Sequence, residues 1–279
     1  MRKVLKRTIT GLALVLVLVP LLIIGDWYFA CLAAFIAYMA NYELLAMFSK
    51  EEPTFKKLKY TMPIYSAAIV VLGYFDSKLI IAGIVMGILL FLIGMVINKH
   101  IKPSTSMKLI FSYIYGGCLP LILLYLRNIN LWIVVLTLVC VMLTDVGGYI
   151  FGFLFGKHKL CPSISPKKTI EGAILGTIFG VACGCALYFV LSKVYNITVF
   201  SIFVDTKLYL EILAVVGITL ILAIAGQLGD LVASRIKRAY DIKDFGKIFP
   251  GHGGILDRFD STLIAGAVMF AICYMIGVI

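Results

Sequence analysis

The most polar long stretch of this sequence is residues 226–260, which read GQLGDLVASRIKRAYDIKDFGKIFPGHGGILDRFD. If the first part of this stretch is helical, its polar side chains share one face, because residues three or four positions apart are neighbours on a helix. The residues concerned are Asp230, Ser234 and either Lys237 or Arg238. That face would present a carboxylate, a hydroxyl and a positive charge together, and such groups bind metal ions and phosphates.

Carboxylates recur at the edges of apolar segments. Asp145 stands in VMLTDVGGYIFG and Asp230 in AGQLGDLVAS, where an acid is costly unless it faces a polar cavity, a metal or a basic partner. Asp257 and Asp260 are three positions apart and share a face if their helix begins early. Mg²⁺ prefers a few such oxygen ligands, with positions left for water and phosphate. The alternatives are ion pairs that hold helices together and, for the last two acids, a solvated acidic helix start.

A glycine-rich turn, FPGHGG, comes shortly before Asp257. Gly253 and Gly254 would let backbone N–H groups approach an anion closely, and His252 can donate to a phosphate or brace the turn. Arg258 adds a positive charge beside this turn. A glycine-rich turn by itself is usually only a turn. It indicates an anion site here only in combination with the charged residues around it.

A second polar motif is SPKKTIEG at residues 165–172. Lys167 and Lys168 stand beside Ser165 and Thr169, and this set can hold a polyphosphate. The alternative is that the lysines are ordinary positive residues before a membrane span, and that the proline and threonine mark the start of its helix.

Together these groups suit phosphoryl or nucleotidyl transfer, in which catalysis consists mostly of positioning and charge neutralisation. The sequence has no GxSxG motif of a serine hydrolase and no GxxxxGK[ST] motif of a P-loop nucleotide site. The seven cysteines lie mostly in apolar runs without CxxC spacing, which indicates neither zinc nor a disulfide framework.

The elements that must position these groups are membrane-spanning helices. The sequence is 62% hydrophobic and 14% charged, with a mean hydropathy of +1.06, which excludes an ordinary soluble domain. Several apolar runs exceed the roughly 18 residues that cross a bilayer. We predict an all-α polytopic integral membrane protein that forms one domain, residues 1–279, with an uncleaved first helix. The nine predicted spans are 8–25, 27–48, 60–75, 79–97, 108–126, 130–151, 170–192, 208–233 and 261–279.

Positive charge is distributed unevenly between the two sides of these spans. Of the 25 Lys and Arg residues, 21 fall in the N-terminal tail and in alternate connections. The other four are Lys78, Arg127, Lys193 and Lys207. The positive-inside rule then places the N-terminus and both chemically rich loops, residues 156–172 and 234–260, in the cytoplasm. This topology accounts for the net charge of +11 without a nucleic-acid partner.

Residues 234–260 resemble the signature of the phosphatidate cytidylyltransferase family, the CDP-diacylglycerol synthases. That signature has a Ser, a Lys-Arg pair, a Lys-Asp pair, HGG, DR and a final Asp. In this sequence the matching positions, without gaps, are Ser234, Lys237 and Arg238, Lys243 and Asp244, His252, Gly253 and Gly254, Asp257 and Arg258, and Asp260. GQLGDL, SPKKTIEG, TDVGGY and the nine spans also look like the family. Gly148 departs from it, since alanine is common there.

The resemblance implies that CTP and phosphatidic acid react to give CDP-diacylglycerol and pyrophosphate. It also implies Mg²⁺ dependence, with a second cation left open, and a homodimer. We expect a multi-pass protein of a bacterial inner membrane, with its catalytic half in residues 140–279 and its active site facing the cytoplasm. The implied metal ligands are Asp230 and Asp257, with Asp145 as a third residue at the metal and Asp260 supporting the metal or its waters. The expected catalytic residues are Asp230, Asp257, Lys237, Ser234 and Asp260, of which Ser234 and Lys237 would contact phosphates. The expected substrate-binding residues are Lys167, Lys168, Ser165, Thr169, Arg238, His252, Gly253, Gly254 and Arg258.

Two other functions stay open at this point. A CTP-dependent lipid kinase, acting on a polyprenol or a similar alcohol, resembles this family in part and would release CDP. A cation transporter or channel would use the intramembrane acids for conduction. It would need charge along a path through both leaflets, whereas the charges here crowd one side.

Overall fold

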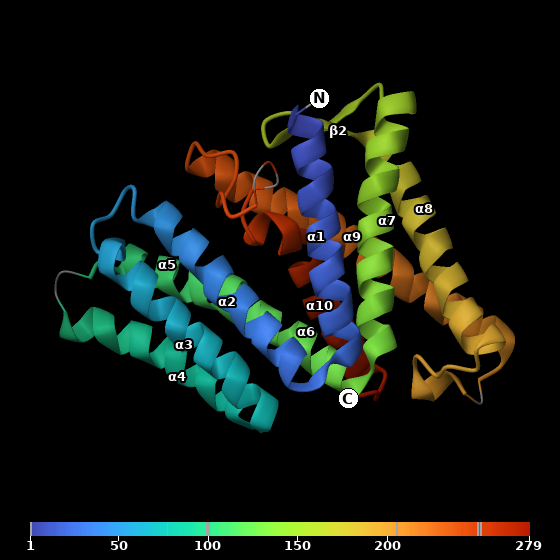
Figure 1. Ribbon diagram of the computed structural model, residues 1–279, viewed down its shortest axis with the longest axis horizontal. Coiled ribbons are helices and arrows are strands. Elements are labelled where there is room, and N and C mark those ends of the chain that lie inside the picture. The colour runs from blue at the N-terminus through green and yellow to red at the C-terminus, as the bar shows by residue number, and fades with distance from the viewer. Residues whose placement is uncertain (1, 77, 99–100, 205, 250, 252) are drawn as a thin grey trace. The chain divides into compact units, whose positions relative to one another are not determined.

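The computed structural model describes residues 2–76, 78–98, 101–204, 206–249, 251 and 253–279, with side chains from residue 11 onward. Most of this part of the chain is helical, which confirms the predicted all-α class (Figure 1). The α-helices are α1 (Arg2–Ile24), α2 (Asp26–Phe48), α3 (Phe55–Phe75), α4 (Lys78–Ile97), α5 (Pro103–Ser112), α6 (Leu119–Ile129), α7 (Leu131–Phe155), α8 (Ile170–Phe189), α9 (Leu208–Ala239) and α10 (Leu256–Met275). Two short strands, β1 (Lys159–Cys161) and β2 (Ser165–Thr169), pair as an antiparallel hairpin.

The helices confirm a polytopic membrane protein. Within the described ranges, eight helices are long and apolar enough to cross a membrane. Each of the nine predicted spans falls on a helix. The first one contributes a shorter apolar helix, Gly11–Ile24, so the count of nine crossings and the cytoplasmic N-terminus stay predictions.

Several helix ends differ from the predicted spans, three of them at or near the polar segments. α3 begins at Phe55 rather than 60, α9 continues to Ala239 rather than 233, and α10 begins at Leu256 rather than 261. Hydropathy marks only the apolar part of a helix, whereas Lys, Arg and a first-turn Asp are compatible with helical turns outside the hydrocarbon. The sequence analysis assumed that residues 230–238 are helical and that the last helix begins before Asp257. Both assumptions hold, since Asp230 to Arg238 lie in α9 and Asp257 and Asp260 lie in α10.

Contacts between residues divide the chain into two compact units. The first comprises residues 1–128 and 242–259. Its centre is α2, which packs along α3 and buries most of one face. A π-helical segment, η1 (Tyr113–Cys118), brings Gly116 so close to α2 that a Cβ there would lie 2.8 Å from the Asn41 backbone nitrogen. Glycine is required at this crossing because α2 leaves no room for a side chain.

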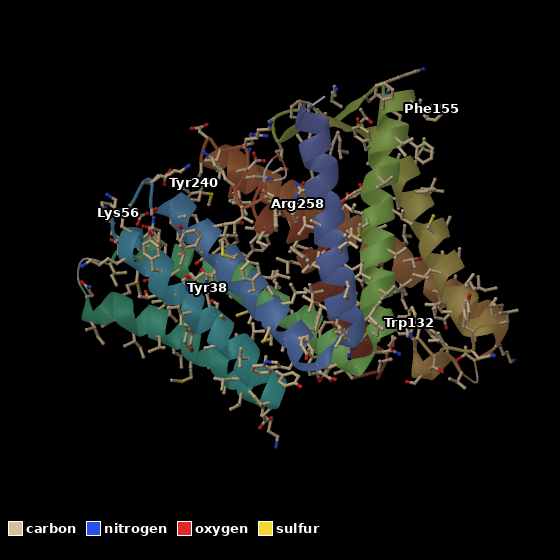
Figure 2. All side chains as sticks on the ribbon, viewed as in Figure 1. Tyr38, Lys56, Trp132, Phe155, Tyr240 and Arg258 are labelled. Atoms are coloured by element: carbon tan, nitrogen blue, oxygen red, sulfur yellow. The ribbon has the colours of Figure 1, made fainter. Side chains whose placement is uncertain are left out.

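The second unit comprises residues 129–241 and 260–279. α7 and α8 form its closest helix pair, and Figure 2 labels Trp132 and Phe155 at opposite ends of α7. α8 presents a glycine every fourth residue. These buried glycines are Gly172, Gly176, Gly180 and Gly184. Lipid supplies no hydrophobic drive between helices, so such small residues hold a pair together by close backbone packing.

We expect Gly176→Val to destabilise this pair strongly. A Cβ on Gly176 would lie 2.6 Å from the Gly148 nitrogen and 2.7 Å from the Thr144 oxygen, and backbone atoms cannot move aside as a side chain can. Overpacking of this kind costs about 1–3 kcal/mol or more. The thermal midpoint of the detergent-purified protein should fall accordingly.

Gly148→Ala is the matched control on the same interface. A Cβ there would lie 3.6 Å from the Gly172 oxygen, an ordinary contact, so alanine fits at this position. Alanine also favours helix by up to about 1 kcal/mol over glycine. Equal thermal midpoints for the two variants would contradict the packing argument.

Candidate active site

In the second unit, the polar cluster is centred on an ion pair between strand β2 and helix α9. The Lys168 ammonium lies 2.5 Å from Oδ2 of Asp230, and both side chains are mostly buried. Asp145, on α7, lies within electrostatic range of both. Ser234, one turn after Asp230 on α9, donates to its Oδ1 at 3.4 Å. The cluster therefore joins residues that are far apart in the sequence and that the sequence analysis selected separately.

The β-hairpin places Lys168 in this cluster. Successive side chains of a strand point to opposite faces, so Lys168 and Lys167 of β2 diverge. Lys168 meets Asp230, whereas Lys167 is exposed. The sequence predicted that both lysines bind one polyphosphate. In the structure their side chains leave the strand in opposite directions.

Thr169 ends β2 and begins α8. Its hydroxyl oxygen accepts a hydrogen bond from the Gly172 N–H at 3.1 Å, which is an N-cap interaction. The start-signal alternative for the SPKKTIEG motif therefore holds for Thr169. Glu171, in the first turn of α8, accepts hydrogen bonds from the N–H groups of Lys157 and His158. These bonds hold the segment before the hairpin against the start of α8.

The remaining predicted residues of this unit lie on α9 and α10. Lys237 is buried, and the Arg238 side chain donates to the Ile164 carbonyl at 3.4 Å, close to the hairpin. Asp260 is also buried, and its Oδ1 accepts from the Ser261 N–H at 2.8 Å. A Cβ on Gly229 would lie 2.7 Å from the Asp260 carbonyl oxygen, so α9 and α10 approach closely beside Asp230.

In the first unit, Asp257 organises the glycine-rich turn. Its Oδ2 accepts hydrogen bonds from the N–H groups of Phe245, at 2.8 Å, and Gly254, at 2.9 Å. Gly253 has φ +84°, a conformation that favours glycine, and a Cβ there would lie 2.7 Å from the same oxygen. The Gly254 N–H, predicted to serve a substrate anion, is therefore directed at Asp257 in this structure.

Glu43 contacts this turn from another helix, and the sequence alone did not assign it to the site. It comes from α2, is 3% exposed, and accepts from the N–H groups of Ile255 at 3.0 Å and Leu256 at 2.9 Å. The signal in the sequence was the cost of an acid inside an apolar segment. Nothing in the sequence indicated its partner, which lies more than 200 residues away.

The predicted site residues thus form two groups, one in each unit. Asp145, Lys168, Asp230 and Ser234 belong to the second, and Asp257 with its glycines to the first. Arg258 is exposed (Figure 2), Ser165 lies in β2, and His252 lies outside the described residues. In the part of the chain that the structure describes, no three Asp, Glu, His or Cys side chains form a metal-binding cluster. The three metal ligands stay a prediction.

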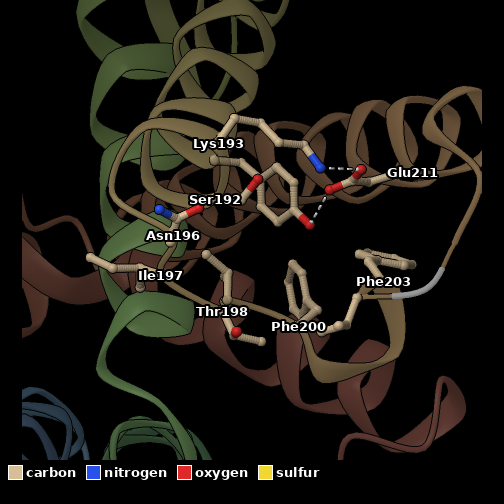
Figure 3. A pocket seen from close by; sticks show the side chains of 11 residues that line it. Ser192, Lys193, Asn196, Ile197, Thr198, Phe200, Phe203 and Glu211 are labelled. Atoms are coloured by element: carbon tan, nitrogen blue, oxygen red, sulfur yellow. Dashed lines mark hydrogen bonds and ion pairs between the residues drawn. The ribbon is translucent and has the colours of Figure 1, made fainter.

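Two pockets differ in where they lie relative to these residues. One of about 360 Å³, at the far end of α8 from Lys168, contains buried Glu211. The Tyr188 hydroxyl donates to Glu211 at 3.0 Å. The Lys193 ammonium donates to the same carboxylate at 2.8 Å, and Figure 3 labels both of these charged residues. The other, of about 530 Å³, is apolar and is formed by α1, α2 and residues 249–259. Ile255 and Phe259, which line it, stand two positions before and after Asp257.

Each group has a distinct chemical capacity. The second-unit cluster offers two carboxylates for a hard cation, on the candidate membrane spans α7 and α9, and a lysine for a phosphate, on β2. The first-unit turn holds a carboxylate in fixed geometry at the start of α10, next to an apolar pocket.

Comparison with known proteins agrees with this chemistry. Residues 5–276 match the model of the cytidylyltransferase family. A phosphatidate cytidylyltransferase of Staphylococcus haemolyticus is 36% identical over 265 residues, which cover 92% of this chain and 94% of that protein. One of Staphylococcus saprophyticus is 35% identical with the same coverage of both chains. One of Staphylococcus aureus strain COL is 49% identical over 137 residues, 49% of this chain and 47% of that protein.

The matched region extends over nearly the whole chain and includes both groups of predicted site residues. The resemblance inferred from the signature at residues 234–260 is therefore confirmed, and this chain belongs to the cytidylyltransferase family.

Proposed function

We propose that this protein transfers the cytidylyl group of CTP to phosphatidic acid, giving CDP-diacylglycerol and pyrophosphate for phospholipid synthesis. The observation that carries this proposal is the similarity, over 92% of the chain, to proteins named phosphatidate cytidylyltransferase. The ion pair of Lys168 and Asp230 beside Asp145 supports it, because metal-assisted nucleotidyl transfer needs these kinds of group.

In this reaction a phosphate oxygen of phosphatidic acid forms a bond to the α-phosphorus of CTP. The bond from that phosphorus to the oxygen bridging to the β-phosphate breaks, and pyrophosphate leaves with the electron pair. The attacking oxygen is already an anion, so no strong general base is required. The obstacle is repulsion between two anions, which positive charge relieves.

We assign Mg²⁺ to the acids of the site, with a second cation left open. The donor set fits, because Asp145 and Asp230 lie together and Mg²⁺ commonly uses one or two carboxylates plus substrate phosphates. Asp257 is the third proposed ligand, and Asp260 supports the bound ion or its waters. When bound, Mg²⁺ would neutralise charge on the α-phosphate and on pyrophosphate.

Phosphate binding falls to the basic and hydroxyl side chains. Lys168 already faces the acidic cluster, so it can turn to a phosphate when the carboxylates hold a cation. The other proposed phosphate ligands are Ser234, Lys237, Arg238 and Lys167, with Ser165, Thr169, His252, Gly253, Gly254 and Arg258 completing the substrate site. The apolar pocket beside Asp257 supports a lipid as the second substrate.

The proposal includes a cellular setting. Multiple apolar helices embed the chain in a membrane, and its relatives are bacterial, which supports the inner membrane. The excess of Lys and Arg on one side supports a cytoplasmic active site, where CTP and magnesium are available. We include a homodimer in the proposal, as the family resemblance implies.

The direct test uses detergent-purified protein, phosphatidic acid, Mg²⁺ and CTP labelled at the α-phosphate. Transfer of label to the lipid fraction with release of pyrophosphate is the expected result. A lipid kinase would instead transfer label only from γ-labelled CTP to a lipid alcohol. Folded protein that labels no lipid from α-labelled CTP would overturn the proposal.

Removal of the metal should stop the reaction. With excess EDTA we expect transfer to fall at least about 1,000-fold, because the repulsion between two phosphates is no longer screened. Added Mg²⁺ should restore the rate, and the thermal midpoint should show that the protein stayed folded. A rate that is unchanged by EDTA would contradict the proposed role of Mg²⁺.

A further inference from the structure

Three consecutive backbone N–H groups at the start of α10 are divided between two carboxylates. The Gly254 N–H donates to Asp257, while the N–H groups of Ile255 and Leu256 donate to Glu43. The first N–H groups of a helix have no partner inside it and need an external acceptor. At this helix an acid from α2 supplies that acceptor, since Ile255, directly before the helix, has no polar side chain.

The turn is also shaped around the Glu43 carboxylate. A Cβ on either Gly246 or Gly254 would overlap the Glu43 carboxylate oxygens. Two separate points of the segment that precedes α10 are therefore pressed against this one side chain. Gly254 has an ordinary φ, so room for Glu43, rather than backbone conformation, requires glycine there.

Glu43 itself is held firmly. It is buried in α2, the central helix of its unit, between Asn41, whose amide donates to Ser66 Oγ at 2.5 Å, and a run of fully buried apolar residues. A negative charge is also favourable at the N-terminus of α10, which attracts anions. The carboxylate is thus a fixed point against which the turn can be placed.

We propose that Glu43 is a positioning residue for cytidylyl transfer: it holds residues 254–256 so that Asp257 has the correct orientation. The inference rests on the proposed function and on the role of Asp257 in it. Glu43 contacts backbone N–H groups of this turn and acts through Asp257. A misplacement of about 1 Å in a catalytic group can cost about 100-fold in rate.

The test compares kcat and KM for CTP in Glu43→Gln, Glu43→Asp and the control Glu211→Gln. Glutamine keeps the size of Glu43 but directs an NH₂ group at an N–H donor, so kcat should fall about 10–100-fold with KM for CTP within twofold. Glu43→Asp keeps both acceptor oxygens and should retain more activity than Glu43→Gln. Glu211 is equally buried and hydrogen-bonded but belongs to the pocket in Figure 3, so its variant should keep the parental kcat.

A second pair of variants approaches the same contact from the turn. Gly254→Ala should lower kcat in the same way, because its methyl group displaces the Glu43 carboxylate. In Glu43→Ala that carboxylate is absent, so adding Gly254→Ala should cause little further loss. Such non-additivity is expected of residues in contact.

The outcomes are separable. Loss of thermal stability with a parental kcat in the protein that remains folded would make Glu43 merely structural and overturn the inference. Additive losses in the double variant would overturn it too. If Glu43→Gln does not fold, Glu43→Asp and Gly254→Ala decide the question by the same kinetic comparison. Failure of the unaltered protein to label lipid from α-labelled CTP would overturn the proposed function and this inference with it.

Discussion

Asp257→Asn is expected to abolish cytidylyl transfer, with a loss in kcat of at least about 1,000-fold, or about 4 kcal/mol. Asparagine keeps an oxygen that can accept from the N–H groups of Phe245 and Gly254, so the turn should persist. What it loses is the negative charge that a metal ligand requires. The measurement is transfer of α-label to lipid, with a thermal melt on the same sample.

Asp257→Ala would be a less informative variant. It would leave two buried N–H groups without their acceptor, at about 1–3 kcal/mol each, so loss of activity could reflect loss of the turn. Asp76→Asn, at an exposed aspartate of the same unit, is the control for removal of one negative charge. A folded Asp257→Asn protein that retains its activity would contradict the assignment of Asp257 as a metal ligand.

Variants of the Lys168 and Asp230 pair should separate two kinds of defect. Asp230→Asn removes a proposed metal ligand, so kcat should fall at least about 100-fold and extra Mg²⁺ should restore part of it. Lys168→Met removes a proposed phosphate contact, so KM for CTP should rise about 10-fold or more, consistent with about 1.5–3 kcal/mol for a hydrogen bond to a charged group. Steady-state kinetics over a range of Mg²⁺ and CTP concentrations measures both.

Two other lysines of the hairpin serve as comparisons for Lys168→Met. Lys167→Met should have a smaller effect than Lys168→Met, because its side chain leaves β2 on the other face and is exposed. Lys159→Met, at an exposed position of β1, controls for the loss of one positive charge. If Lys168→Met matches Lys159→Met in both kcat and KM, the pair with Asp230 serves only to hold α9 and the hairpin together.

Hydropathy and residue spacing predicted the helices well, because the patterns they use are local. The face that carries Asp230 and Ser234 requires only that α9 stay helical, and it does. The sequence alone did not show that α10 begins as early as Leu256. Its apolar run begins later than the helix, and the acceptor that completes its first turn comes from Glu43, far along the chain.

Other features could not be predicted because they depend on packing between segments. Adjacent lysines look equivalent in SPKKTIEG, yet the strand separates Lys167 from Lys168. The glycines of α8 look like ordinary small residues of an apolar helix, and only the distance to the α7 backbone shows why they cannot be larger. The signature at residues 234–260 indicates the family without explaining why Gly254 must be glycine; the Glu43 carboxylate explains it.

The glycine contacts of α8 also bear on how the protein should be handled outside its membrane. Because α7 and α8 meet closely through backbone atoms at Gly172 and Gly176, we expect the pair to depend little on which lipid surrounds it. Exchange of lipid for a mild detergent should leave these helices, and the hairpin that connects them, associated. The Lys168 and Asp230 cluster should then survive extraction, so purified material is a sound starting point for substrate-binding experiments on this half of the site.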